Sequence, residues 1–152
     1  MRLWRLTRRP HVALNGAGAL RAGTRYTPPG VPLVSLASEA GLAVLVALRY
    51  LPENRAEWPD DYVLGHTDVA AVPERISDAA DDAAVGHALR EWLAGGTSLL
   101  CAVQSRVLPE ADVVYLNPRH PAAATVPPLA CRAFSFADCL HRPPALDRYR
   151  SV

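Results

Sequence analysis

The sequence predicts a compact single domain of the α+β class over residues 1–152, in which residues 140–152 form a peripheral tail. Two observations lead to this class. The chain has 152 residues, of which 50% are hydrophobic and 20% are charged, enough for one core and too few for two comfortable domains. Short β-rich segments also alternate with two helical segments, without an internal repeat or a linker.

The first third of the chain predicts two strands and a helix around a glycine-rich connection. "RLWRL" (residues 2–6) alternates as a strand does. Residues 15–30 end in the turn "TPPG", where two prolines fix φ and a glycine permits the reversal. The β-rich residues 31–37 predict the second strand. Ser38 is a candidate N-cap for an apolar helix over residues 39–51.

The middle of the chain predicts one more strand and a second helix. "YVLGHTDV" (residues 62–69) is β-rich and follows a polar loop. Asp82 is a candidate cap for the helix "AAVGHALREWL" (residues 83–93), which two consecutive glycines bring to an end.

The last third predicts three strands. Residues 97–104 are apolar enough for a buried strand, and residues 112–117 follow after a turn. Residues 118–128 contain several prolines and predict an extended loop. "AFSFADCL" (residues 133–140) alternates and predicts the final strand.

Composition argues against several classes of protein. A net charge of +1 predicts no direct nucleic-acid partner, and no apolar run approaches the ~20 residues that cross a bilayer. The three cysteines do not predict a disulfide framework, and the N-terminus lacks the apolar region of a secretion signal. We therefore expect a reduced cytoplasmic protein without a membrane partner.

The glycine-rich stretch does not match the common phosphate-binding loops. It lacks the Gly-Lys-Ser/Thr of a P-loop, and Arg21 occupies the third glycine position of the dinucleotide fingerprint. Arg21 and Arg25 are four residues apart, and guanidinium groups bind pyrophosphate or carboxylate well. The alternative is a surface hairpin with solvated arginines.

Two further segments carry polar candidates. Ser105 follows a buried strand without a Gly-x-Ser-x-Gly elbow, so it is either a cleft residue or a turn serine. "YLNPRHP" presents Asn117, Arg119 and His120 between prolines, and a lone histidine is commonly structural. Cys131, Cys139 and His141 match no standard zinc spacing, so no metal is predicted.

In this order the segments resemble a known family, the RES domain toxins. The resemblance runs from "RLWRL" through "NGAGALRAGTRYTPPGVPLVSLA" to "LLCAVQSRVLPEADVVYLNPRHP" and "FSFADCL". It implies a fold similar to ADP-ribosyltransferases, with a split mixed sheet around an NAD cleft. It further implies the NAD-consuming toxin of a bacterial toxin–antitoxin pair, which acts by NAD degradation, phosphorolysis or ADP-ribosyl transfer to a protein acceptor. The implied partner is an antitoxin with an Xre-like helix-turn-helix region that covers the active site.

The resemblance also implies site residues. The family Arg corresponds to Arg25, followed by Tyr26 where the family usually has Trp, and the family Ser corresponds to Ser105. Asn117 and His120 match the "NP-x-H" loop. The resemblance thus implies catalytic roles for Arg25 and Ser105, and NAD contacts from these two residues together with Tyr26, Asn117 and His120.

Four positions depart from the family pattern. Ser35 stands in place of a Tyr, Tyr50 in place of a His and Val113 in place of an Asn. Val46 replaces the family Glu, and valine cannot stabilise positive charge on the ribose as a carboxylate would. Glu39 precedes Val46 by two helical turns, ~10 Å, which makes it a poor substitute.

Three functional hypotheses therefore remain. The first is an active NAD-consuming toxin with an altered site. The second is a degenerate, catalytically weak RES domain that binds NAD or an antitoxin. The third is an unrelated metal-binding or structural domain built on the two C-terminal cysteines and His141.

Overall fold

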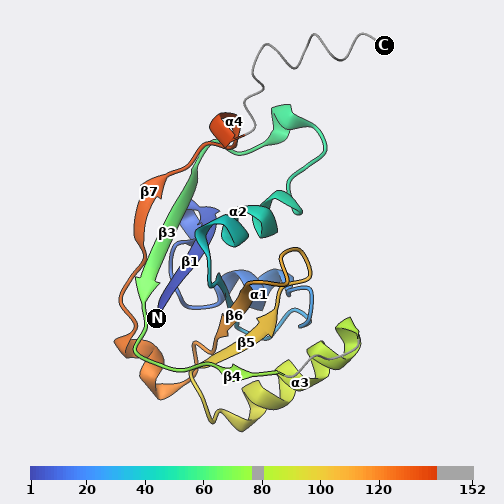
Figure 1. Ribbon diagram of the computed structural model, residues 1–152, viewed down its shortest axis with the longest axis vertical. Coiled ribbons are helices and arrows are strands. Elements are labelled where there is room, and N and C mark those ends of the chain that lie inside the picture. The colour runs from blue at the N-terminus through green and yellow to red at the C-terminus, as the bar shows by residue number, and fades with distance from the viewer. Residues whose placement is uncertain (77–80, 140–152) are drawn as a thin grey trace.

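The computed structural model describes residues 1–76 and 81–139, and these contain one seven-stranded mixed sheet (Figure 1). The strand order is β4-β5-β6-β2-β1-β3-β7. The pair β4–β5 is parallel and the other pairs are antiparallel. The strands are β1 Arg2–Arg8, β2 Val34–Ala37, β3 Tyr62–Asp68, β4 Glu74–Arg75, β5 Leu100–Gln104, β6 Asp112–Leu116 and β7 Ala130–Ala133.

The sheet consists of two halves that meet at a single point. β1 pairs with β3 over its whole length, from Arg2 to Arg8, whereas β1 and β2 pair only at Trp4 and Ala37. The half β4-β5-β6-β2 and the half β1-β3-β7 therefore diverge on either side of this contact (Figure 1). The predicted α+β class and the split mixed sheet are confirmed.

Two helices cover the same face of the sheet. α2 (Ala40–Leu48) buries Leu42 and Ala43 over the seam between the two halves, and its Leu45 is 37% exposed. α3 (Asp82–Gly95) buries Leu89 and Trp92 against β5 and β6, and it ends at a glycine in the left-handed region. The described residues also include α1 (Ala17–Ala22), α4 (Phe136–Cys139) and short 3-10 helices at Arg9–His11, Arg55–Glu57 and Pro121–Thr125.

The predicted helix caps are each displaced by one residue. Ser38 does not cap α2, because its hydroxyl accepts the backbone N–H of Asp112 at 3.0 Å and so ties β2 to β6. Glu39 takes the N-cap position without a side-chain hydrogen bond. Asp81, and not Asp82, caps α3 by accepting the N–H of Ala84 at 2.8 Å.

Two predictions about secondary structure are wrong. The glycine-rich connection contains the helix α1, which follows Gly16 and ends at Gly23. The predicted strand over residues 133–140 is instead the end of β7 and the helix α4. Its alternation reflects aromatic packing, because Phe136 is buried among Phe134, Tyr62 and Trp58. The predicted tail over residues 140–152 lies outside the described residues.

The aromatic cluster predicts a large effect of truncating Phe136. The side chain is 5% exposed, so Phe136→Ala should lower the free energy of unfolding by about 3 kcal/mol. Denaturant unfolding would measure the change, with Val72→Ala, at an 89% exposed position, as the control. Equal stability of the two variants would contradict the packing described for α4.

Candidate functional site

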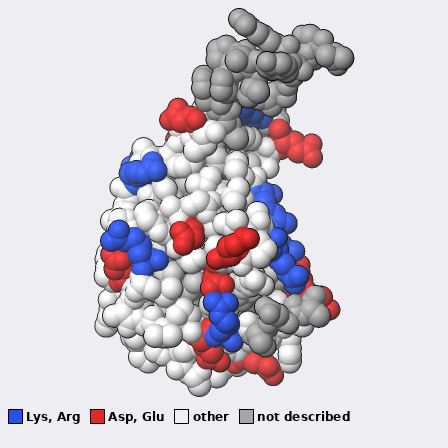
Figure 2. All heavy atoms as spheres, viewed as in Figure 1, with Lys and Arg blue, Asp and Glu red and all other residues white. Residues whose placement is uncertain are grey.

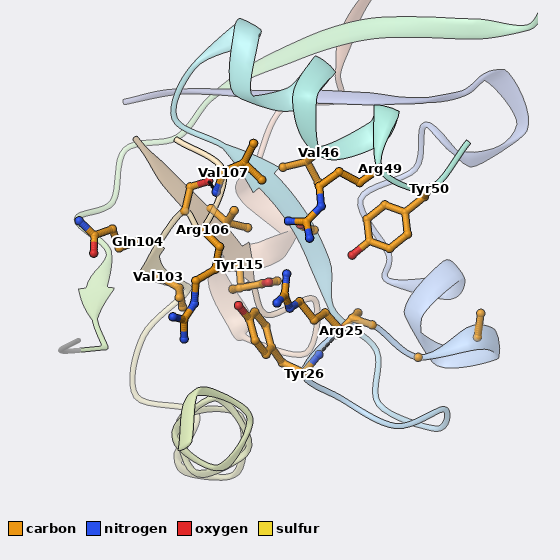
Figure 3. A pocket seen from close by; sticks show the side chains of 16 residues that line it. Arg25, Tyr26, Val46, Arg49, Tyr50, Val103, Gln104, Arg106, Val107 and Tyr115 are labelled. Atoms are coloured by element: carbon orange, nitrogen blue, oxygen red, sulfur yellow. Dashed lines mark hydrogen bonds between the residues drawn. The ribbon is translucent and has the colours of Figure 1, made fainter. Parts of the chain in front are cut away.

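A cavity of about 580 Å³ opens beside the seam of the sheet, between α2 and the β5–β6 turn (Figure 3). Five segments line it: the turn after α1, the middle of β2, the C-terminal end of α2, the β5–β6 turn and β6. The lining residues are Ala22, Gly23, Thr24, Arg25, Tyr26, Ser35, Val46, Arg49, Tyr50, Val103, Gln104, Ser105, Arg106, Val107, Val113 and Tyr115.

The turn after α1 is built to present Arg25 and Tyr26. Gly23 ends α1 at φ 74°, and an added Cβ would lie 2.7 Å from the carbonyl oxygen of Thr27. The backbone N–H of Thr24 donates to the Thr27 carbonyl at 2.8 Å, and the two threonine hydroxyls are 2.9 Å apart. The turn is therefore closed on itself, and its two central side chains face the cavity.

The charged side chains of the cavity wall are all cationic. Arg25, Arg49 and Arg106 line it, and no carboxylate is among its lining residues. On the outer face shown in Figure 2, by contrast, acidic and basic side chains are interspersed. Asp82 lies behind the wall, where its Oδ2 accepts from Arg25 Nε at 2.8 Å and its Oδ1 is 3.7 Å from Arg106 Nη2. This arrangement suits an anionic ligand.

Aromatic rings complete the wall. The Tyr26 ring is buried and meets the Tyr115 ring edge to face at 6.3 Å, and the Arg25 guanidinium lies 5.7 Å from the centre of the Tyr26 ring. Burial raises the pKa of Tyr115, so its hydroxyl stays protonated at neutral pH. Tyr50 is 70% exposed and lies with Arg49 at the opposite side of the space from Tyr26 (Figure 3). The cavity thus combines cations with flat surfaces for a ring.

Ser105 lines the cavity and also shapes the turn that bounds it. Its Oγ accepts the backbone N–H groups of Val107 and Leu108, both at 3.2 Å, and the residue is 3% exposed. The cleft and turn interpretations therefore both describe this serine, since its hydroxyl proton remains available to a ligand while its oxygen holds the turn.

Asn117 and His120 do not line this cavity. Asn117 is buried, and its Oδ1 accepts the N–H of Arg119 at 3.0 Å. His120 Nδ1 accepts the N–H of Ala122 at 3.1 Å and caps a 3-10 helix. Both side chains therefore make local structural contacts. They do not share the cavity that Arg25, Tyr26 and Ser105 line together.

A second cavity of about 280 Å³ adjoins the first. It is lined by the end of β1, by β2 and by α2, and it contains no carboxylate among its lining residues. Arg5 lines it, and the Nη1 atom of Arg5 is buried without a hydrogen-bond partner among the described residues. Burial also lowers the pKa of this guanidinium. A water molecule or a ligand with an acceptor atom, such as an anionic group, would satisfy this donor.

Sequence reasoning missed Arg5. "RLWRL" was interpreted only as a strand. An arginine between Trp4 and Leu6 in a β-rich segment was the available signal, but its burial depends on the split between β1 and β2, which is a long-range feature.

The four positions at which the resemblance implies a departure from the family pattern lie together. Ser35, Val46, Tyr50 and Val113 line both cavities, and they are the only residues common to the two linings. Glu39 lines neither cavity, so it does not return a carboxylate to the site.

Other candidate sites receive no support from the described residues. Cys131 and Cys139 are free and exposed, and His141 lies outside the described residues. Within residues 1–76 and 81–139, no three His, Cys, Asp or Glu side chains are grouped to hold a metal ion. None of the helices in this described part is both long enough and apolar enough to span a membrane.

Comparisons with known proteins show a family and a fold to which this chain is similar. Residues 2–138 match the family described as "RES domain". The chain is 32% identical over 123 residues to the Prs ADP-ribosylating toxin of Sphingobium sp. (strain YBL2), covering 72% of this chain and 75% of that protein. Its fold is similar to a chain of the M. tuberculosis MbcT–MbcA toxin–antitoxin complex, with a TM-score of 0.63 and 19% identity over 97% of this chain and 87% of that one.

The double role of Ser105 predicts a loss of stability when its hydroxyl is removed. Ser105→Ala leaves two partly buried N–H groups without an acceptor, which should lower the free energy of unfolding by about 1–3 kcal/mol. Denaturant unfolding would measure this, with Val107→Ala in the same turn as the control. A Ser105→Ala protein as stable as the parent would refute the role in the turn.

Proposed function

This chain belongs to the RES domain family, and on that premise we propose that it is the NAD-consuming toxin of a toxin–antitoxin pair. The observation that carries the proposal is the cavity with three guanidinium groups and no lining carboxylate. NAD presents a pyrophosphate between two nucleosides, and guanidinium groups and tyrosine rings are the complementary side chains. The relative that is named an ADP-ribosylating toxin supports the same substrate.

Six of the lining residues have a chemical task in this proposal. Arg25, with Arg49 and Arg106, neutralises the pyrophosphate, and the rings of Tyr26 and Tyr50 pack against the nucleoside rings. Ser105 donates its hydroxyl proton to the substrate. Asn117 and His120 act indirectly, by fixing the loop after β6.

The reaction we propose breaks the bond between the nicotinamide nitrogen and C1′ of its ribose. Nicotinamide leaves with the bonding electron pair, which neutralises its own positive charge. An oxygen of phosphate, or a nucleophilic side chain of a protein acceptor, forms the new bond to C1′. With phosphate the products are nicotinamide and ADP-ribose 1-phosphate.

The four residues that line both cavities, at the junction between them, set the rate of this step. Positive charge grows on the ribose as nicotinamide leaves, and neither cavity offers a carboxylate to stabilise it. By analogy with deletion of one preorganised group, we expect a rate about 10²–10³-fold below that of a site with the carboxylate. Arg5 needs an acceptor for its buried Nη1, and the incoming phosphate or acceptor carboxylate would provide one.

The partner we propose is an antitoxin with an Xre-like helix-turn-helix region that covers the cavity. The similar structure comes from a toxin–antitoxin complex. Tyr50 and Val107 are exposed apolar or aromatic residues of the cavity lining and would be available to such a partner.

A second candidate function is a degenerate RES domain that binds NAD or an antitoxin with little turnover. The specific observation in its favour is that Val46 stands at the junction of two cavities that both lack a carboxylate. In this case NAD binding depends on the arginines alone, and no bond of NAD has to be broken.

One prediction from the proposed function concerns Arg25. NAD consumption by the purified protein, with and without phosphate, should fall by about 100-fold or more in Arg25→Ala, because one preorganised charge at the substrate is lost. Arg119→Ala, at an exposed position outside the cavity, is the matched control. Unchanged NAD consumption by Arg25→Ala would refute the proposed site.

The second prediction concerns Val46. Val46→Glu should raise the rate of NAD consumption by about 10–100-fold, because it returns a carboxylate to the junction. Val46→Gln, which has nearly the same shape without the charge, should not. If Val46→Glu combined with Ser35→Tyr gives no gain over an inactive parent, the degenerate-domain hypothesis is contradicted.

A further inference from the structure

We propose that helix α3 holds Arg25 in place for the substrate, with Asp82 as the positioning residue. This inference rests on the proposed function, since it assigns a task to a helix that contributes no residue to the cavity lining. Asp82 itself lies outside the lining, so its effect on a ligand passes through the arginines.

One face of α3 contacts the turn that carries Arg25. Asp82, Gly86 and Arg90 are spaced four residues apart and therefore lie along one side of the helix. Asp82 Oδ2 accepts from Arg25 Nε at 2.8 Å and lies 2.7 Å from Nη2. One turn later, a Cβ added at Gly86 would lie 2.9 Å from the carbonyl oxygen of Tyr26. One turn further, Arg90 Nη1 donates to the same carbonyl at 3.5 Å.

Helix α3 is a rigid support for the turn that carries Arg25, because it is packed against the sheet and capped. Leu89 and Trp92 are buried against β5, and the Trp92 Nε1 group donates to Ser98 Oγ at 2.8 Å. Asp81 caps the N-terminus directly before Asp82. Arg25 and Arg106, by contrast, both belong to turns. The carboxylate of Asp82 therefore connects two turn residues to a packed helix.

The geometry leaves Arg25 free to bind. Asp82 contacts Nε and Nη2 of the guanidinium with a single oxygen, and Nη1 makes no hydrogen bond to a described residue. Fixing a long arginine side chain costs conformational entropy, and a side chain that is already held in place loses less of it when the ligand binds. The exposed pair itself should add little to folding stability, because solvent screens it.

The test is a double-mutant cycle on ligand binding. Calorimetry would give the Kd of NAD for the parent, Asp82→Asn, Arg25→Ala and the double variant. We expect Asp82→Asn to weaken binding about 3- to 10-fold in the parent and to have a much smaller effect in the Arg25→Ala background, where only the 3.7 Å contact between Asp82 and Arg106 remains. Asp82→Glu, which keeps the charge, should recover part of the loss. Asp68→Asn, which breaks the comparable exposed pair between Arg2 and Asp68, is the matched control and should bind as the parent does.

Gly86→Ala provides an independent variant. The added methyl group forces the Tyr26 carbonyl away from the helix, so binding should weaken although every charge is kept. Circular dichroism and the unfolding midpoint would show that each variant is folded.

The outcomes separate this inference from the proposed function. Asp82→Asn that binds NAD as well as or better than the parent, or that weakens binding equally in the Arg25→Ala background, overturns the positioning role. If the parent does not bind NAD, the proposed substrate is wrong, and the same cycle is run with inorganic pyrophosphate, which probes the arginines alone. If Asp82→Asn weakens pyrophosphate binding and this effect depends on Arg25, the positioning role is supported. If the parent does not bind pyrophosphate either, the positioning role is overturned together with the proposed substrate.

Discussion

Backbone pairing between β1 and β2 is limited to Trp4 and Ala37, and both cavities follow from this constraint. β2 is fully paired with β6 on its other side, so the half-sheet β4-β5-β6-β2 keeps its own register while β1-β3-β7 turns away. α2 covers the seam from one face. Beside α2, no strand pairing closes the gap between the two half-sheets, and side chains line the two cavities there. Ser35 pairs with Tyr115 of β6 but lies in the part of β2 that does not pair with β1, which explains why it borders both cavities.

The electrostatic design follows from what surrounds that seam. Three arginines reach the larger cavity from three different segments, while the carboxylate that pairs with two of them lies outside it on α3. In the smaller cavity, Arg5 Nη1 has no hydrogen-bond partner in the described part of the chain. The interior of the site is thus cationic although the whole chain has a net charge of only +1. Binding of an anion is favoured locally, without the global field that would attract nucleic acid.

Much of the fold could be predicted from the sequence, because β-rich segments and helical periodicity are local signals. Errors arose where a distant residue decides the outcome. The hydroxyl of Ser38 is taken by the N–H of Asp112, and Phe136 alternates with its neighbours because it packs into an aromatic cluster. For the site, the resemblance to a family points to Arg25, which lines the larger cavity; its role there stays a prediction. Arg5 could not be found in the same way, since its burial without a partner exists only once the half-sheets diverge.

The four residues at the junction of the cavities also bear on how such a protein changes over time. None of their side chains makes a hydrogen bond within the described residues, and they come from β2, α2 with the residues after it, and β6. Replacement of any one of them therefore breaks no side-chain hydrogen bond, although Val46 and Val113 also pack against the core cluster beside α2. The fold thus constrains the size of the side chains at these two positions more than their polarity. Chemistry at the place that matters most for the proposed reaction can change in single substitutions without the loss of a hydrogen bond.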